Sequence, residues 1–381
     1  MCKWIGLVCI VLGTLAGCGG DGESAASTPA GVPKIIIDSD YNTMSDDGQL
    51  GAMAVQLQAA GKVQVMGISV VSGNQWLKQG VVDALMSVER LGVGQRIGIY
   101  AGANLALDHS YATIQKEMQA GAGGDGYLGA WGSPEPKTDA DLKPPPDGFA
   151  THTTLQSQSA IDFIVSTVKA NPNEITILAI GPLTNIALAT QRNPEIVPLI
   201  KKIIYMGGAI DVAGNTTRTA EFNWWFDPLA AQYVVRLPIP QVVVPLDVTD
   251  TVILTKTIYD RIAHPATPTA VTKVFQQLNG YGFDGKNGFE TNPAYTQNIW
   301  DTLTLAYLVD PTYATQTEER YVDVNATVGV DDGRSIGYTM QPAGPILQKM
   351  TVVKKFDNAR FFDFYVDLLT RPVPVTLPAT R

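Results

Sequence analysis

The sequence predicts an α/β fold in which a mostly parallel central sheet, of the open Rossmann-like kind, carries helices on both faces. Two observations predict this class. Short β-branched runs, such as residues 35–37, alternate along the chain with helical stretches that close on glycine, such as residues 49–61. This alternation is typical of βαβ units, whose strands are parallel. Ligands of such sheets bind beyond the carboxyl ends of the strands, so polar residues that follow strands form the candidate site.

The elements are expected in alternation along the chain. Strands are expected at residues 35–37, 63–71, 97–100, 175–180 and 203–206, and helices at residues 49–60, 79–91, 159–170, 182–190 and 303–309, while residues 230–235 and 241–246 extend the scheme. Two segments interrupt it, namely residues 108–147, which are rich in glycine and proline, and residues 263–299. Loops this long inside a compact domain are usually functional or mobile. The sequence shows no internal repeat, so we expect one folded domain.

The N-terminus has the features of an export signal. Lys3 precedes an apolar run at residues 4–15, which is too short to span a membrane comfortably. Residues 15–18, Leu-Ala-Gly-Cys, resemble the bacterial lipobox, in which the cysteine is lipidated and becomes the mature N-terminus. The resemblance implies a lipid anchor on Cys18 that holds the protein to a membrane of the bacterial cell envelope.

Three parts of the chain follow from this interpretation. Residues 1–17 are expected to be a lipoprotein signal peptide. Residues 18–32, rich in Gly, Ser, Ala and Pro, are expected to form a lipidated flexible tether. Residues 33–381 are expected to form the folded domain that carries the chemistry.

Composition excludes several kinds of chemistry. The three cysteines are Cys2, Cys9 and Cys18, so the expected domain holds no disulfide, no cysteine-ligated zinc and no cysteine nucleophile. The net charge of −9 and the absence of a basic run argue against nucleic acid as a partner. A small polar or cationic ligand is compatible with this charge.

Four acids follow the first expected strand. Asp38, Asp40, Asp46 and Asp47 lie within a short segment directly after residues 35–37. Carboxylates this close repel one another unless a cation or protons neutralise them. A hard divalent ion satisfies such oxygen ligands, and calcium tolerates irregular geometry best. The plainer alternative is a solvated acidic loop.

Two other known motifs also begin with Asp-x-Asp, but they explain residues 38–47 less well. An EF-hand loop beginning at Asp38 requires glycine at its sixth position, which is Thr43, and glutamate at its twelfth, which is Gln49. It also requires a preceding helix, where a strand is expected. An aspartate-nucleophile phosphatase gives no reason for the second acid pair.

The order of the polar blocks resembles that of the inosine–uridine preferring nucleoside hydrolases over almost the whole expected domain. The matching blocks are residues 38–47, 67–74, 100–103, 175–189, 206–209, 214–215, 220–223, 227–231, 246–249 and 300–301. The block at residues 175–189, with Ala-Ile-Gly-Pro-Leu-Thr-Asn-Ile-Ala, is the most specific. The resemblance implies a nucleoside-hydrolase-like catalytic domain that hydrolyses the N-glycosidic bond of ribonucleosides to free base and ribose.

The resemblance also implies a calcium site and a catalytic base. Asp40, Asp47 and Asp301 would hold Ca²⁺ through their carboxylates, and the backbone carbonyl of Ile180 would add another oxygen. Asp40 would act as general base on a calcium-bound water that attacks the anomeric carbon. The transition state of glycosidic cleavage resembles an oxocarbenium ion, which nearby negative groups stabilise.

The remaining expected site residues contact or support the substrate. Asn74, Asn215, Glu221 and Asn223 would hold sugar hydroxyls, Asp38 and Asp46 would bond to the sugar or support the metal ligands, and Met206 and Trp300 would line the substrate site. Relatives of this kind are often dimers or tetramers, which implies a possible homo-oligomer.

The chain differs from the family at the residues that act on the leaving base. Many members have a histidine directly before the last calcium-binding aspartate, where this chain has Trp300, and Ala122 stands at the position of a second family histidine. The first loop also differs, with Met44 where an acid is common. Trp300 would stack on the base, and Asp125 or Tyr127 is a candidate for the missing proton donor.

These differences are also compatible with further hypotheses. His109 or His152, in or beside the long loop, could reach the pocket. The chain could instead hydrolyse another riboside, or it could be a calcium-dependent ribose- or nucleoside-binding lipoprotein without turnover.

Overall fold

The computed structural model describes Met1 and residues 31–43, 45–119, 126–282 and 285–374. Within these, the described residues of 32–374 form one compact unit. Apart from Met1, the expected signal peptide lies outside the described residues, as do Cys18, Met44, Ala122 and Asp125. Among the residues that are described, no helix has the length and apolar character needed to cross a membrane.

The centre of the unit is a nine-stranded sheet in the order β10-β9-β11-β6-β5-β4-β1-β2-β3. Its strands are β1 (Lys34–Ser39), β2 (Gln64–Val70), β3 (Ile99–Ala101), β4 (Ile175–Ala179), β5 (Lys202–Met206), β6 (Gln241–Val244), β9 (Ala314–Val324), β10 (Ser335–Tyr338) and β11 (Lys349–Phe356). Neighbouring strands are parallel except that β9 runs antiparallel to both β10 and β11. A separate antiparallel pair joins β7 (Ile253–Leu254) to β8 (Gln297–Asn298).

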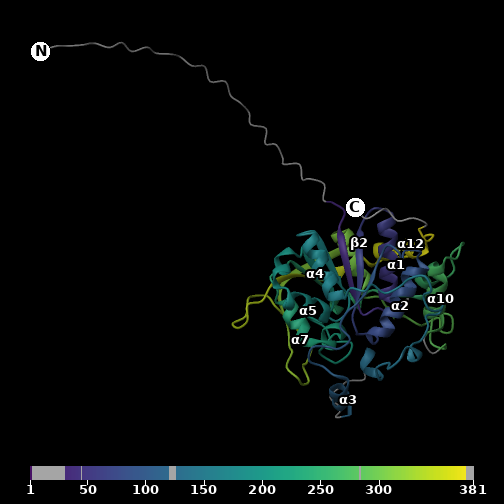
Figure 1. Cartoon of the computed structure of the whole chain (residues 1–381), viewed down its shortest axis with the longest axis horizontal. Coiled ribbons are helices and arrows are strands. Elements are labelled where there is room, and N and C mark those ends of the chain that lie inside the picture. The colour runs from purple at the N-terminus through teal and green to yellow at the C-terminus, as the bar shows by residue number, and fades with distance from the viewer. Residues whose placement is uncertain (2–30, 44, 120–125, 283–284, 375–381) are drawn as a thin grey trace. The chain divides into compact units, whose positions relative to one another are not determined.

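Helices cover both faces of the sheet, as Figure 1 shows for α4, α5 and α7 on one side and α1, α2, α10 and α12 on the other. The first group comprises α4 (Ala160–Ala170), α5 (Thr184–Arg192) and α7 (Pro228–Val235). The second shares one core and comprises α1 (Asp46–Ala59), α2 (Leu77–Arg90), α8 (Leu246–Thr249), α9 (Lys256–Ala263), α10 (Ala270–Tyr281), α11 (Thr302–Val309) and α12 (Asn358–Thr370). Two further helices, α3 (Tyr111–Gln119) and α6 (Phe222–Phe226), lie in long connections. The prediction of a mostly parallel α/β fold is confirmed.

The central strand β1 explains why a run of isoleucines precedes the acids. Ile36 packs into the core beneath α4 and α5, whereas Ile35 and Ile37 pack into the core beneath α1 and α2. Successive side chains of a strand point to opposite faces, so a strand covered on both faces needs apolar residues at every position.

Several expected boundaries are corrected. The helix expected from residue 49 begins at Asp46, so Asp46 and Asp47 both lie in its first turn, where the positive end of the helix dipole favours acids. The expected interruption at residues 263–299 contains α10, whose N-terminus is capped by the Thr269 side chain accepting from the backbone N–H of Thr272.

The strand order places a ligand crevice between β1 and β4. The strands β3-β2-β1 continue in one direction and β4-β5-β6 in the other, so β1 and β4 meet where the winding reverses. In open α/β sheets, ligands bind outside the carboxyl ends of the strands at this point. Asp40 follows β1 directly, and Ile180 follows β4.

Candidate active site

A cavity of about 390 Å³ lies at these strand ends. It is lined by Asp40, Asn42, Ser45, Asp46, Asn74, Tyr127, Ile180, Met206, Asn215, Glu221, Phe222, Asn223, Gln297, Trp300 and Asp301. Ten of the site residues predicted from the sequence are among them, whereas Asp38 and Asp47 are not. Sequence reasoning missed Asn42 and Ser45, which lie between β1 and α1, and Gln297 of the two-residue strand β8, because the sequence does not fix the path of these segments.

Three carboxylates converge beside this cavity. Asp46, Asp47 and Asp301 each offer one oxygen, and these oxygens lie within 4.8 Å of one another. The first two come from the first turn of α1, and Asp301 directly precedes α11. The resemblance implies Asp40, Asp47 and Asp301 as the carboxylate ligands, and the structure adds Asp46, because α1 already begins at this residue. Asp40 lies close enough to the group for its charge to interact with those of Asp47 and Asp46.

The two carboxylate oxygens of Asp40 differ in their hydrogen bonding. The backbone N–H of Asn74 donates to its Oδ2 at 2.7 Å. Its Oδ1 is buried and has no hydrogen-bond partner among the described residues. Burial, together with the nearby charge of Asp47, raises the pKa of Asp40 well above its usual value.

The other acids of the group are oriented by neighbouring donors. Asp47 accepts hydrogen bonds from Ser39 Oγ at 2.6 Å, Ser45 Oγ at 3.0 Å and Asn74 Nδ2 at 3.0 Å. Burial and the charge of Asp46 raise the pKa of Asp47 to about 7. Burial and the charges of the other acids raise the pKa of Asp301 well above its usual range.

These observations fit a bound hard cation. An unpartnered, buried carboxylate oxygen is costly, and so are several carboxylates that repel one another out of water. A divalent cation among Asp40, Asp46, Asp47 and Asp301 relieves both costs, since carboxylate oxygens are its preferred ligands. The residues can therefore hold a metal ion.

Asp38 lies behind the cavity. It is fully buried, and its Oδ1 accepts hydrogen bonds from Ser69 Oγ at 2.5 Å and from Asn185 Nδ2 at 2.8 Å. Of the two roles predicted for Asp38, direct contact with a substrate does not agree with this position, because the side chain is fully buried and does not line the cavity. The geometry agrees with the supporting role.

Asn185 is a positioning residue that sequence reasoning missed. Besides Asp38, its Nδ2 reaches the carbonyl of Val70 at 3.3 Å, and its Oδ1 accepts from the backbone N–H of Ala103 at 2.8 Å. One amide thus joins the ends of β1, β2 and β3. The signal available in the sequence was its place in the most specific family block.

Glu221 and two asparagines form the opposite wall. The carboxylate of Glu221 accepts backbone N–H groups from Gly208, Asn223 and Trp224 at 2.9, 2.7 and 3.1 Å. It caps α6, and burial raises its pKa to about 7. These bonds fix the first turn of α6 and hold Asn223 at the cavity.

Hydrogen bonds also position Asn223 and Asn215 beside Glu221. Asn223 Nδ2 donates to the carbonyl of Met206 at 3.1 Å, and Asn215 Oδ1 accepts from the backbone N–H of Phe222 at 2.9 Å. All three predicted residues, Met206, Asn215 and Asn223, therefore have defined positions at the cavity wall.

Aromatic rings line the remaining side. Trp300 donates its indole N–H to Asp250 Oδ1 at 3.0 Å. Tyr127 donates its hydroxyl to Asn74 Oδ1 at 3.1 Å, and its ring lies 4.9 Å from that of Phe222. The polar groups of both aromatic side chains are therefore engaged in hydrogen bonds, and both residues line the cavity.

The chain's three histidines all lie away from this cavity. His109 is buried with its Nε2 2.8 Å from Asp332, His264 pairs with Glu290 at 2.9 Å, and His152 is exposed. None of them lines the cavity. The hypothesis that His109 or His152 reaches the pocket is wrong for the described structure.

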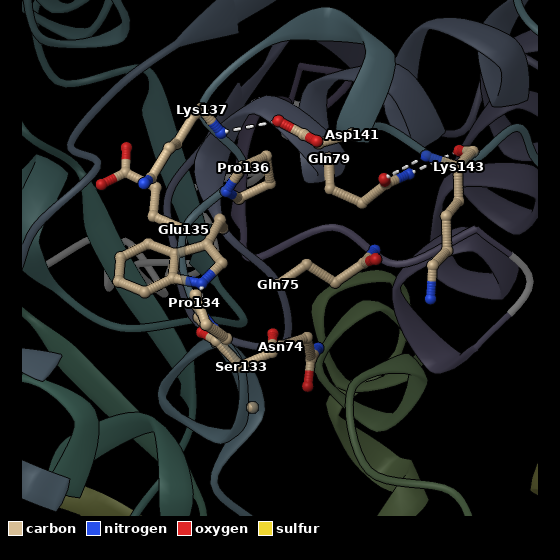
Figure 2. A pocket seen from close by; sticks show the side chains of 13 residues that line it. Asn74, Gln75, Gln79, Ser133, Pro134, Glu135, Pro136, Lys137, Asp141 and Lys143 are labelled. Atoms are coloured by element: carbon tan, nitrogen blue, oxygen red, sulfur yellow. Dashed lines mark hydrogen bonds between the residues drawn. The ribbon is translucent and has the colours of Figure 1, made fainter.

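A second cavity, of about 510 Å³, adjoins the first at Asn74 (Figure 2). Gln75 and Gln79 project into it, and Gln79 exchanges two hydrogen bonds of 2.8 Å with the backbone of Lys143. The converging carboxylates do not line this cavity. The chemistry of the acids therefore belongs to the smaller cavity.

The sheet is doubly wound, and an acid-lined cavity lies where its winding reverses, between β1 and β4. These features are typical of α/β enzymes with a carboxylate metal site. The sequence profile of the inosine-uridine preferring nucleoside hydrolase family matches residues 35–363. The chain belongs to this family and is a nucleoside hydrolase.

Individual relatives agree with this assignment. The chain is 30% identical over 303 residues, 80% of this chain and 86% of the relative, to the pyrimidine-specific ribonucleoside hydrolase RihB of Escherichia coli. The structure of the purine-preferring ribonucleoside hydrolase from Gardnerella vaginalis is similar with a TM-score of 0.69 and 26% identity, covering 88% of this chain and 98% of that one. A plant nucleoside hydrolase shares the fold with a TM-score of 0.73 and 22% identity, covering 90% and 100% of the two chains.

Proposed function

We propose that this nucleoside hydrolase cleaves the N-glycosidic bond of ribonucleosides to free base and ribose, with Asp40 as general base. The observation that carries the proposal is the unpartnered Oδ1 of Asp40 beside three converging carboxylates. A carboxylate with one oxygen anchored and the other free is oriented to accept a proton at the free oxygen.

We propose Ca²⁺ as the metal, held by Asp47 and Asp301 together with Asp40, with the backbone carbonyl of Ile180 and the carboxylate of Asp46 as further candidate ligands. When bound, calcium supplies positive charge that acidifies a nearby water and orients sugar hydroxyls. The donor set consists only of oxygen, which favours calcium over softer metals.

The chain's own residues would carry the reaction. Asp40 takes a proton from the attacking water, and the backbone N–H of Asn74 keeps the carboxylate in place during transfer. Positive charge grows on the sugar as the bond to the base breaks, and the surrounding carboxylates stabilise it. Asp38 supports this arrangement from behind through Asn185.

Sugar recognition would come from both walls of the cavity. Asn74 lies on the acid side, and Asn215, Glu221 and Asn223 lie on the opposite side with Met206. Holding the sugar between two rigid walls reduces the entropy cost of reaching the transition state.

Turnover is tested by incubating the purified protein with calcium and a panel of purine and pyrimidine ribonucleosides, and measuring free ribose. We expect ribose release that is lost on removing the metal. Asp40→Asn should lower kcat by about 10²–10⁴-fold, the usual size of a general-base contribution, while circular dichroism stays unchanged. Calcium-dependent ribose binding without release would contradict the proposal and indicate a binding protein.

We also propose that Cys18 is lipidated and that the protein is anchored to a membrane of the bacterial cell envelope. The support is the lipobox-like sequence before Cys18 and the polar residues after it. Labelling with a radioactive fatty acid and fractionation test this proposal. Cys18→Ala should abolish labelling and release the protein from the membrane fraction, whereas unchanged labelling would contradict the assignment.

A further inference from the structure

The walls of the active cavity have an unusual balance of charge. Four carboxylates line it, those of Asp40, Asp46, Glu221 and Asp301, and its described lining contains no lysine, arginine or histidine. A bound divalent cation offsets only part of this formal negative charge, so the cavity still favours a ligand with positive charge.

The same cavity presents aromatic faces without spare hydrogen-bond donors. The indole N–H of Trp300 is used by Asp250, which also accepts from Asn298 Nδ2 at 3.2 Å. This pair of bonds fixes the ring and places a negative charge behind it. A flat cation stacked on Trp300 would gain a cation–π interaction, for which tryptophan is the best partner.

Tyr127 is poorly suited to give up a proton. Its hydroxyl already donates to Asn74 Oδ1. Burial, and next the charges of Asp40, Asp47 and Asp46, raise the pKa of Tyr127. An ordinary nucleobase departs as an anion unless it receives a proton, so this wall does little for such a leaving group.

We infer that the preferred substrates are N-ribosides whose leaving group is a cationic heteroaromatic ring of the pyridinium type. The inference rests on the proposed hydrolysis and specifies its substrate class. The geometry that carries it is that Trp300, held by Asp250, lines the same cavity as four carboxylates.

The chemistry of such a substrate requires no acid. Water adds its oxygen to the anomeric carbon and gives its proton to Asp40. The bond between the anomeric carbon and the ring nitrogen breaks, and its electron pair goes to the nitrogen, which thereby loses its positive charge. The ring departs as a neutral pyridine, and the products are ribose and one proton.

The inference is tested with the full chain and calcium, using N-ribosylpyridinium, uridine and inosine as substrates. We expect kcat/KM for N-ribosylpyridinium to exceed the values for both nucleosides by at least about 10²-fold, the lower size of a general-acid contribution. Equal or higher values for uridine or inosine would overturn the inference. If no substrate releases ribose, the proposed hydrolysis itself fails.

Trp300→His separates this preference from the intrinsic reactivity of the pyridinium. The variant gains a proton donor and loses the stacking face, so uridine cleavage should rise about tenfold while N-ribosylpyridinium cleavage falls about fivefold. Phe149→His is the matched control, because Phe149 is exposed and lines neither cavity, and it should leave the ratio unchanged. A parallel change of both rates in Trp300→His would overturn the inference.

Discussion

Asp40 is confined by two backbone segments that approach it closely. A Cβ atom added at Gly73 would lie 2.2 Å from Asp40 Oδ2, and one added at Gly181 would lie 2.9 Å from Oδ1. Contacts this short are impossible for real atoms, so only glycine leaves room for the carboxylate. The close approach also lets the backbone N–H of Asn74 bond to Oδ2.

Gly73→Ala tests this confinement. The new methyl group must displace the Asp40 carboxylate, and a small misplacement of a catalytic group costs up to about 10²-fold in rate. We therefore expect kcat to fall at least about tenfold, with a smaller change in KM. Steady-state kinetics measures this, and Gly132→Ala is the control, since its added Cβ lies 3.8 Å from Leu128. An unchanged kcat in Gly73→Ala would show that the position of Asp40 is not limiting.

Asn185 carries a second prediction at the residue scale. Asn185→Ala removes donors from buried Asp38 and leaves the backbone groups of Val70 and Ala103 without this partner. Buried unsatisfied polar groups cost about 1–3 kcal/mol each, so we expect a loss of about 2–4 kcal/mol in the free energy of unfolding.

Urea denaturation measures this loss. Asn193→Ala serves as the control, because the Asn193 side chain donates to the carbonyl of Ala189 in the helix that it follows. Similar losses of unfolding free energy in the two variants would mean that the hydrogen bonds of Asn185 to three strand ends do not stabilise the fold more than an ordinary helix-end bond.

At the scale of elements, α2 holds the connection that follows β1. Asp83 of α2 is buried and accepts from the backbone N–H of Thr43 at 3.3 Å, from Gln75 Nε2 at 2.7 Å and from Gln79 Nε2 at 3.2 Å. Burial raises the pKa of Asp83 to about 6 despite these bonds. Helix α2 thus holds Thr43, which lies in the connection between Asp40 and α1.

The raised pKa of Asp83 predicts a pH dependence of stability. The folded state binds the proton more tightly than the unfolded chain, whose aspartate pKa is about 3.9. The contribution of Asp83 is therefore fully present below about pH 4 and is lost as pH rises through about 6, at no more than about 1.4 kcal/mol per pH unit. Asp83→Asn should flatten this part of the pH profile.

Urea denaturation of metal-free protein between about pH 4.5 and 7 provides the measurement, because Asp83 titrates in roughly this range. The same substitution at Asp363, whose side chain is 75% exposed, is the control and should leave the slope unchanged. A variant Asp83→Asn with the wild-type slope would contradict the assignment.

For the whole molecule, the clustered acids couple metal binding to folding. They meet only when β1, α1 and α11 are assembled, so an unfolded chain lacks the site. A ligand that binds only the folded state stabilises it by about 2.7 kcal/mol at a concentration of 100 Kd. We therefore expect calcium to raise Tm and a chelator to lower it.

Calorimetry with and without calcium tests this coupling. Asp301→Asn removes one converging ligand and should lose most of the calcium-dependent rise in Tm, while Asp310→Asn, at the other end of α11, should retain it. A calcium effect of equal size in the wild-type protein and Asp301→Asn would contradict the proposed site.

The sequence by itself determined the class of fold and most of the cavity. The alternation of β-branched runs with helical stretches predicted the parallel sheet, and acids placed after the first strand predicted its ligand-binding end. These signals are local, because strand and helix periodicity are written in neighbouring residues. The order of the polar blocks along the chain was enough to identify ten of the lining residues.

Only the tertiary structure decided which acids converge and which residues support them. Asp46 converges with Asp47 and Asp301, because α1 begins at Asp46 and packs so that its first turn meets the start of α11. Asp38 turns away from the cavity to meet Asn185, 147 positions along the chain. Such pairings depend on how distant segments pack against one another, and no local pattern in the sequence records them.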